Sequence, residues 1–272
     1  MLGKLLKHEF KATGRHFLFM YAFFALITVC NKIFLEITIN NKFWEIFQVL
    51  FMAAYVLTCA AIFVLTTVLI ITRFYKNMMC DEGYLMFTLP VTVSQHIISK
   101  CLVAFVWSIL SAVIFFLSLL LLISGHGIAE FFTKAGEFIS QVSDYCGPRL
   151  WIFVVIYVIA MIIGTFYNIL QYYMSISIGQ LVNKHRVLAA FGAYFGINFV
   201  LQNIVSFGFL FLNLFSSFSP EYVDIHTEAE FAQFFLQYMN IVGVASLVIN
   251  TALGIAFFFV TRFILTKKLN LE

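Results

Sequence analysis

Six long apolar runs dominate the sequence and limit what the chain can fold into. Each run reaches about 20 residues, the length that an α-helix needs to cross the hydrocarbon core of a bilayer. Only 11% of the residues are charged, whereas a typical soluble domain has about 25%. The runs are continuously apolar, unlike the alternating strands of a membrane β-barrel. We therefore predict an all-α, polytopic integral membrane protein with six transmembrane helices at about 17–37, 46–72, 99–123, 151–181, 188–214 and 241–265.

The basic residues are distributed unevenly among the segments that connect these runs. If the N-terminus is cytoplasmic, 12 of the 16 lysines and arginines fall on the cytoplasmic side of the membrane. Cytoplasmic segments of membrane proteins are enriched in these two residues. The distribution therefore predicts that both the N-terminus and the C-terminus are cytoplasmic.

Residues 1–16 precede the first run and have two chemically different helical faces. One face is apolar and the other is basic, a pattern that is typical of a helix lying in the membrane interface. The apolar face holds Leu2, Leu5, Leu6 and Phe10, and the basic face holds Lys4, Lys7, His8, Lys11 and Arg15. We predict an amphipathic interfacial helix over 1–16 and one six-helix domain over 17–272. The residues leave open whether this helix binds only anionic lipid or also a cytoplasmic partner.

Two further helices are predicted on the outer side of the membrane. Residues 127–142 place apolar side chains at helical spacing opposite polar ones, which indicates a surface helix. Thr227 and Glu230 have the spacing of a capping box, and an apolar stripe then runs directly into the sixth span. Cys30 and Cys146 both fall toward the outer side, but their spacing alone does not establish a disulfide, and we expect none.

The segment 73–100 is the only predicted cytoplasmic connection that is long enough to hold structure of its own. Pro90 disfavours a helical conformation at the residue before it, so a helix that ends there must be short. Thr92 and Gln95 form a second capping box, which predicts that the third span's helix begins just after Pro90.

The short helix would hold apolar side chains below the bilayer, namely Tyr84, Leu85, Met86, Phe87 and Leu89. An apolar patch in water indicates an interaction surface. It either folds back onto the inner ends of the bundle or inserts into a groove of a cytoplasmic protein. The residues by themselves leave both alternatives open.

The same segment resembles the inner loop of type-2 ATP-binding-cassette (ABC) exporter permeases. The family's loop has an acidic pair, a glycine, a leucine-rich stretch, a proline and then Ser-Lys at the third span. The matching residues here are Asp81, Glu82, Gly83, Leu85, Leu89, Pro90, Ser99 and Lys100. Six spans, cytoplasmic termini, an amphipathic N-terminal helix and an outer helical segment before the sixth span are also similar to that family. Tyr84 departs from the family, which often has Thr after the glycine.

The resemblance implies a function, partners and a location. The chain would be the permease subunit of an exporter in the bacterial plasma membrane, paired with a second permease copy in a homodimer or heterodimer. It would move a hydrophobic or amphipathic substrate across that membrane, powered by a separate cytoplasmic ABC ATPase. Contact with the ATPase would involve Asp81, Glu82, Gly83, Tyr84, Leu85, Phe87, Leu89 and Pro90. Membrane lipid is an expected partner and nucleic acid is not.

Sequence motifs for catalysis or nucleotide binding are absent from the chain. It has no G-x-x-x-x-G-K-[ST], so any ATP and Mg²⁺ would be bound by the partner ATPase. H-E-x-x-H and G-x-S-x-G are missing too, and the six histidines lack metal-ligand spacing. We therefore expect neither an enzyme nor a metal site.

The polar residues within the predicted spans are uncharged. Most such residues form hydrogen bonds between helices, but some line substrate paths. The candidates for a path are Asn168, Gln171, Tyr172, Gln202, Asn203 and Asn250. Proton-coupled carriers usually keep a carboxylate or histidine within the membrane, which disfavours that class. The alternative to an exporter subunit is a stand-alone membrane protein, either a self-immunity factor or an ATP-independent carrier.

Overall fold

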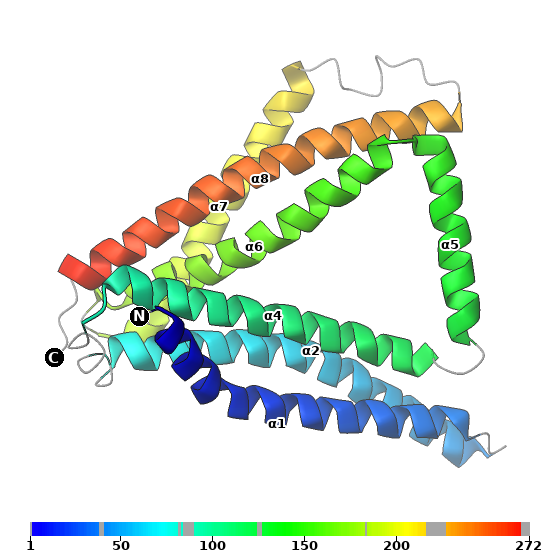
Figure 1. The fold of residues 1–272 in the computed structure, drawn as a ribbon, viewed down its shortest axis with the longest axis horizontal. Helices are drawn as coiled ribbons and strands as arrows, with labels where there is room; N and C mark the ends of the chain where they lie inside the picture. Colours follow the sequence, from blue (N-terminus) through cyan, green and yellow to red (C-terminus); the bar gives the residue numbers. More distant parts are fainter. Residues whose placement is uncertain are drawn as a thin grey trace. The chain divides into compact units, whose positions relative to one another are not determined.

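The predicted all-helical membrane architecture is confirmed by a computed structural model (Figure 1). The structure describes residues 2–37, 41–80, 83, 90–123, 127–182, 184–215 and 227–267. Within these residues it forms seven helices, of which six are long and apolar enough to cross a membrane. The helices are α1 (Leu2–Glu36), α2 (Lys42–Met79), α4 (Val93–Ile123), α5 (Gly127–Cys146), α6 (Arg149–Gly179), α7 (Arg186–Phe215) and α8 (Glu228–Lys267).

Both predicted capping boxes are present at helix starts. Before α4, the Gln95 amide donates to Thr92 Oγ1 (3.4 Å) and the Thr92 amide donates to Gln95 Oε1 (3.2 Å). Before α8, Thr227 and Glu230 form the same reciprocal pair, at 3.3 and 3.2 Å. Each box satisfies two backbone N–H groups that have no partner within the helix. These contacts fix where the third and sixth membrane helices begin.

Helix α1 joins the predicted interfacial helix and the first span in one continuous element, Leu2–Glu36. At 1.5 Å per residue its 35 residues extend over about 50 Å. The hydrocarbon core of a bilayer is only about 30 Å thick. Several turns of α1 must therefore lie beyond that core, and the charged N-terminal turns are the ones suited to the interface.

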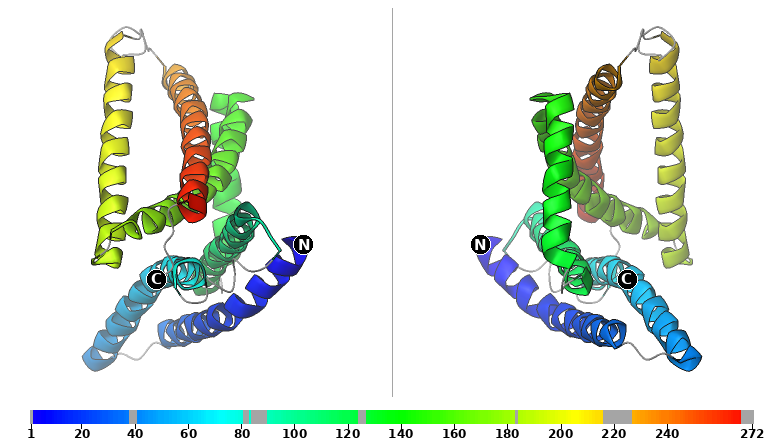
Figure 2. Two further views of the ribbon diagram at one scale, coloured as in Figure 1. Left: turned by 90° about the vertical axis from the view of Figure 1, so that its left-hand side faces the viewer. Right: turned by 90° about the vertical axis from the view of Figure 1, so that its right-hand side faces the viewer.

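The chain divides into two compact units, and the boundary lies within α5 at residues 133 and 134. The first unit contains α1, α2 and α4, and the second contains α6, α7 and α8. These units describe how the helices pack, and the predicted division into an interfacial helix over 1–16 and one six-helix domain over 17–272 stays a prediction. Figure 2 shows the helices of each unit from two further sides.

The core of the first unit is aromatic, and hydrogen bonds between helices run through it. Helix α1 packs against both α2 and α4, and Phe17 stacks on Trp107 with ring centroids 4.4 Å apart. The Ser111 hydroxyl lies 2.8 Å from both Tyr21 Oη and Thr66 Oγ1, which connects all three helices. Because lipid gives apolar helices no hydrophobic reason to associate, such packing and hydrogen bonds hold membrane helices together.

In the second unit, α6 packs along α8 (Figures 1 and 2). Helix α6 also contacts α7, close to the turn that joins α6 to α7. At Gly179 an added Cβ would lie 2.6 Å from the Ala190 Cβ and 2.7 Å from the Arg186 carbonyl oxygen. Only glycine permits this close approach. The rings of Tyr167 and Phe257 lie 5.4 Å apart between α6 and α8.

Candidate functional site

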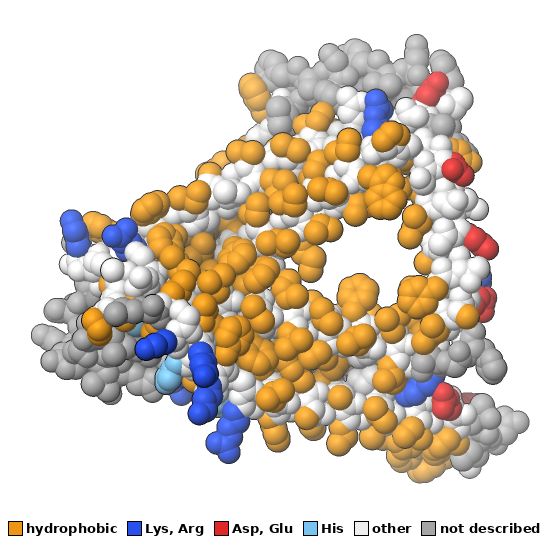
Figure 3. All heavy atoms as spheres, in the orientation of Figure 1, with side chains coloured by type: hydrophobic (Ala, Val, Ile, Leu, Met, Phe, Trp, Pro, Cys, Tyr) orange, Lys and Arg blue, Asp and Glu red, His pale blue; other side chains and the backbone are white. Residues whose placement is uncertain are grey.

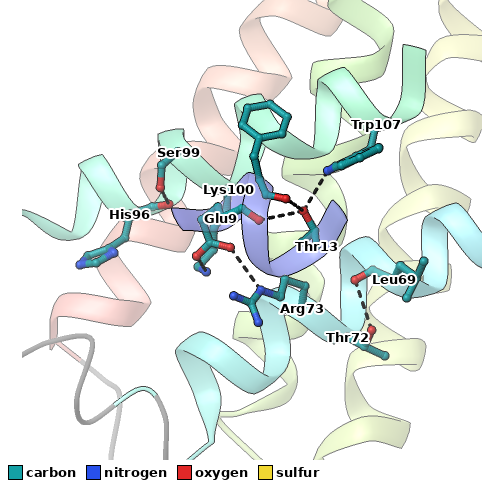
Figure 4. Close-up of polar contacts among 10 residues, drawn as sticks. Glu9, Thr13, Leu69, Thr72, Arg73, His96, Ser99, Lys100 and Trp107 are labelled. Carbon is teal, nitrogen blue, oxygen red and sulfur yellow. Dashed lines mark hydrogen bonds and ion pairs between the residues drawn. The ribbon is translucent and has the colours of Figure 1, made fainter. Parts of the chain in front are cut away.

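Three charged side chains from three helices of the first unit meet in one buried ion cluster (Figure 4). Glu9 comes from α1, Arg73 from α2 and Lys100 from α4. Lys100 Nζ lies 2.5 Å from Glu9 Oε1, and Arg73 Nε lies 3.2 Å from Glu9 Oε2. Each carboxylate oxygen therefore binds one cation, and Glu9 connects α1 to both other helices.

The burial of this cluster makes its members depend on one another. Glu9 is 3% exposed and Lys100 is 4% exposed. Moving an ion out of water costs several kcal/mol, which only close pairing and hydrogen bonding offset. The side chain of Arg73 is 29% exposed, so part of its charge remains solvated. Removal of a partner should therefore destabilise the protein most when the charge left behind belongs to Glu9 or Lys100.

Hydrogen bonds extend the contact between α1 and α4 beyond the ion cluster. Thr13 Oγ1 donates to the Glu9 carbonyl oxygen (2.8 Å) and accepts a hydrogen bond from Trp107 Nε1 (2.9 Å). The same tryptophan stacks on Phe17, one turn farther along α1. Glu9, Thr13 and Phe17 therefore fix two successive turns of α1 against α4.

The cluster lies near the two helix ends that carry the connection 80–92. Arg73 is six residues before the last residue of α2, and Lys100 is seven residues after the first residue of α4. At 1.5 Å per residue, each lies about 10 Å from its helix end. Glu9 therefore ties both ends of the connection that contains residues 81–90, the predicted ATPase contact (here called the coupling segment), to α1.

Most of the residues that we predict to contact the ATPase lie outside the described residues. This applies to Asp81, Glu82, Tyr84, Leu85, Phe87 and Leu89. Gly83 is buried, and its amide donates to the Cys80 carbonyl oxygen at 2.7 Å. An added Cβ at Gly83 would lie 3.0 Å from the Met78 carbonyl oxygen, so the backbone there approaches the end of α2 closely. Pro90 is exposed.

The Ser-Lys pair of the resemblance lies inside the first unit rather than on its surface. Ser99 is buried, and its hydroxyl donates to the His96 carbonyl oxygen at 2.9 Å. Lys100 belongs to the ion cluster. These two residues therefore contribute to the interior that supports the connection.

The predicted path residues are all in the second unit, on three helices and with different exposure. On α6, Asn168 is exposed, Gln171 is 1% exposed, and Tyr172 packs against Tyr194 of α7 with ring centroids 5.4 Å apart. The Asn203 amide of α7 donates to the Phe199 carbonyl oxygen of its own helix at 2.7 Å. Gln202 of α7 is exposed and Asn250 of α8 is partly buried. Their role in a path remains a prediction.

Sequence reasoning missed Glu9, the residue at the centre of the site. It is the single acid of the basic N-terminal segment, and it follows Leu5 and Leu6 by four and three residues. That spacing places it on the apolar face of the helix. An acid on an apolar face was the available signal, because such a position requires a buried cationic partner.

The five cysteines are free thiols, including Cys30 and Cys146. Among the residues that the structure describes, no three His, Cys, Asp or Glu side chains are grouped so that they could hold a metal ion. Comparisons of the chain with protein-family models, curated proteins and solved structures found no match.

Proposed function

We propose that the chain is the permease subunit of an ABC-type exporter in the bacterial plasma membrane. A separate cytoplasmic ATPase, which binds ATP and Mg²⁺, would dock on the segment 81–90 and power the movement of a hydrophobic or amphipathic substrate. A second permease copy would complete the path, for which Asn168, Gln171, Tyr172, Gln202, Asn203 and Asn250 are the candidate lining residues.

The buried ion cluster is the observation that carries this proposal. A coupling segment transmits force only if the helices on which it is mounted move together with the rest of their unit. Glu9 binds Arg73 near the end of α2 and Lys100 near the start of α4. A displacement of the connection would therefore reach α1 directly, in addition to α2 and α4.

The unburied surface of α7 is consistent with a second copy. Within α7, no side chain of the apolar stretch Arg186–Gly208 is buried. Three of its large apolar side chains, Phe191, Phe195 and Phe199, are more than 60% exposed. Lipid covers such a helix in a monomer, and another permease copy would cover part of it in a dimer.

The proposal is tested by co-purification with an ABC ATPase encoded beside the chain's gene. The tagged chain should retain the ATPase in mild detergent, and Leu85→Asp should abolish retention because a charge cannot enter an apolar groove without a partner. Phe138→Asp is the matched control. Phe138 is 66% exposed on α5, which is predicted to lie on the opposite side of the membrane, so this variant should bind the ATPase as the wild type does.

Two results would contradict the proposal. One is a chain that never retains an ATPase, which would favour a stand-alone membrane protein. The other is equal retention by wild type and Leu85→Asp, which would place the contact outside 81–90.

A further inference from the structure

A groove of about 500 Å³ runs between α1 and α2 on the surface of the first unit. Its lining residues are Arg15, His16, Phe19, Met20, Leu65 and Leu69. Met20 and Leu69 pack against the aromatic core and form its floor. Phe19 is 78% exposed and Leu65 is 46% exposed, so these two form its rim. The groove is open, apolar along most of its length and basic at one end.

The contact between Glu9 and Arg73 sets the depth of the groove in the membrane. It places residue 9 of α1 level with residue 73 of α2, and the two helices run in opposite directions (Figure 1). Arg15 and His16 therefore lie toward the N-terminal, interfacial end of the groove. Phe19 and Met20 follow about 5.4 Å deeper, one helical turn along α1. This order matches that of a phospholipid, whose phosphate lies at the interface and whose acyl chains lie below it.

The two basic side chains at this end are available for a ligand. Arg15 and His16 are exposed and form no hydrogen bond or ion pair with any residue that the structure describes. Glu9, the acid nearest in sequence, is already bound by Arg73 and Lys100. Over the first turns of α1, Figure 3 shows basic side chains that give way to hydrophobic ones farther along the helix.

We propose that this groove binds an anionic phospholipid of the leaflet that surrounds the N-terminal half of α1. The Arg15 guanidinium would bind the phosphate, since its planar donors match phosphate oxygens in pairs, and His16 would add a second donor. One acyl chain would lie over Met20 and Leu69, between Phe19 and Leu65. The site needs no ATPase, so it stands apart from the exporter proposal.

The test is native mass spectrometry of the full chain released from nanodiscs that contain equal amounts of phosphatidylglycerol and phosphatidylcholine. The wild type should retain phosphatidylglycerol in preference to phosphatidylcholine. Arg15→Gln should lower that preference about fivefold, the effect expected of one basic residue near an anionic membrane surface. Arg15→Lys should keep part of the preference, because it keeps the charge but loses the paired planar donors.

Two further variants distinguish binding of lipid in the groove from general electrostatic attraction of anionic lipid to the basic helix. Lys11→Gln removes an exposed charge one turn before Arg15 that does not line the groove, so it should change the preference by less than half as much. Leu65→Trp fills the groove without altering charge and should lower retention of phosphatidylglycerol.

Three results would overturn the lipid site. These are no preference in the wild type, equal losses in Arg15→Gln and Lys11→Gln, or unchanged retention in Leu65→Trp. The residues substituted are exposed, and thermal unfolding of each variant checks that the fold is intact.

Discussion

Glu9→Gln should be far more damaging than its small change in shape suggests. The substitution keeps the size of the side chain but removes the charge that binds Lys100 at 2.5 Å and Arg73 at 3.2 Å. Lys100 is 4% exposed, so its ammonium group cannot turn to water when the carboxylate is lost. The Gln amide would also place N–H donors against two groups that are themselves donors.

The expected loss follows from the burial of the cluster. Breaking a buried ion pair by removing one partner typically costs about 3–5 kcal/mol, because the remaining charge stays buried. Arg73 is less confined, since 29% of its side chain is exposed, and it should contribute the smaller share. We therefore expect Glu9→Gln to lower the free energy of unfolding by about 3 kcal/mol or more.

Glu36→Gln provides a matched control within the same helix. Glu36 pairs with Lys32 at 3.0 Å on the surface of α1, and its side chain is 63% exposed. Exposed pairs at this spacing contribute about 0.3–0.5 kcal/mol. Reversible unfolding of both variants in mixed micelles, titrated with dodecyl sulfate, measures the two losses side by side.

The double variant Glu9→Gln/Lys100→Met adds an internal check. It should recover part of the stability lost in Glu9→Gln, because it removes the buried cation that the first change leaves behind. The reasoning is refuted if Glu9→Gln and Glu36→Gln lose stability equally, or if the double variant is no more stable than Glu9→Gln.

Packing and hydrogen bonding lead to two further expectations. Gly179→Ala should destabilise the protein by about 1–3 kcal/mol, as overpacking does, whereas Gly192→Ala should be neutral or stabilising because nothing lies within 4 Å of an added Cβ there. Similar Tm values for both would contradict the close approach of α6 and α7. Tyr21→Phe should cost about 0.6–1.7 kcal/mol by removing the hydroxyl that contacts Ser111. An unchanged Tm would argue against that hydrogen bond. So would a double variant, Tyr21→Phe/Ser111→Ala, whose loss of stability equals the sum of the two single losses.

Features encoded locally could be predicted from the sequence. The six membrane helices follow from apolar length alone, and the capping boxes at Thr92 and Thr227 follow from residues three positions apart. The prediction ended the interfacial helix at residue 16, where the composition changes. Nothing in the backbone interrupts the helix there, because α1 is continuous from Leu2 to Glu36. A change of solvent does not require a change of secondary structure.

The ion cluster could not be predicted because its members are distant in sequence. Glu9 meets Arg73 across 64 residues and Lys100 across 91 residues. From the sequence alone, Arg73 and Lys100 indicate only that their segments lie on the cytoplasmic side of the membrane. Their pairing depends on how α1 packs against α2 and α4, which hydropathy does not specify. The division into two units is likewise a property of packing between helices.

The most direct test of the central claim is photo-cross-linking from position 85 in living cells. A benzoylphenylalanine in place of Leu85 should form a covalent adduct with an ABC ATPase, and the same probe at Phe138 should not. Peptide sequencing of the adduct identifies the captured protein. Adducts that contain only this chain, or no adduct at position 85 while the probe is incorporated, would contradict the claim that the segment 81–90 binds an ATPase.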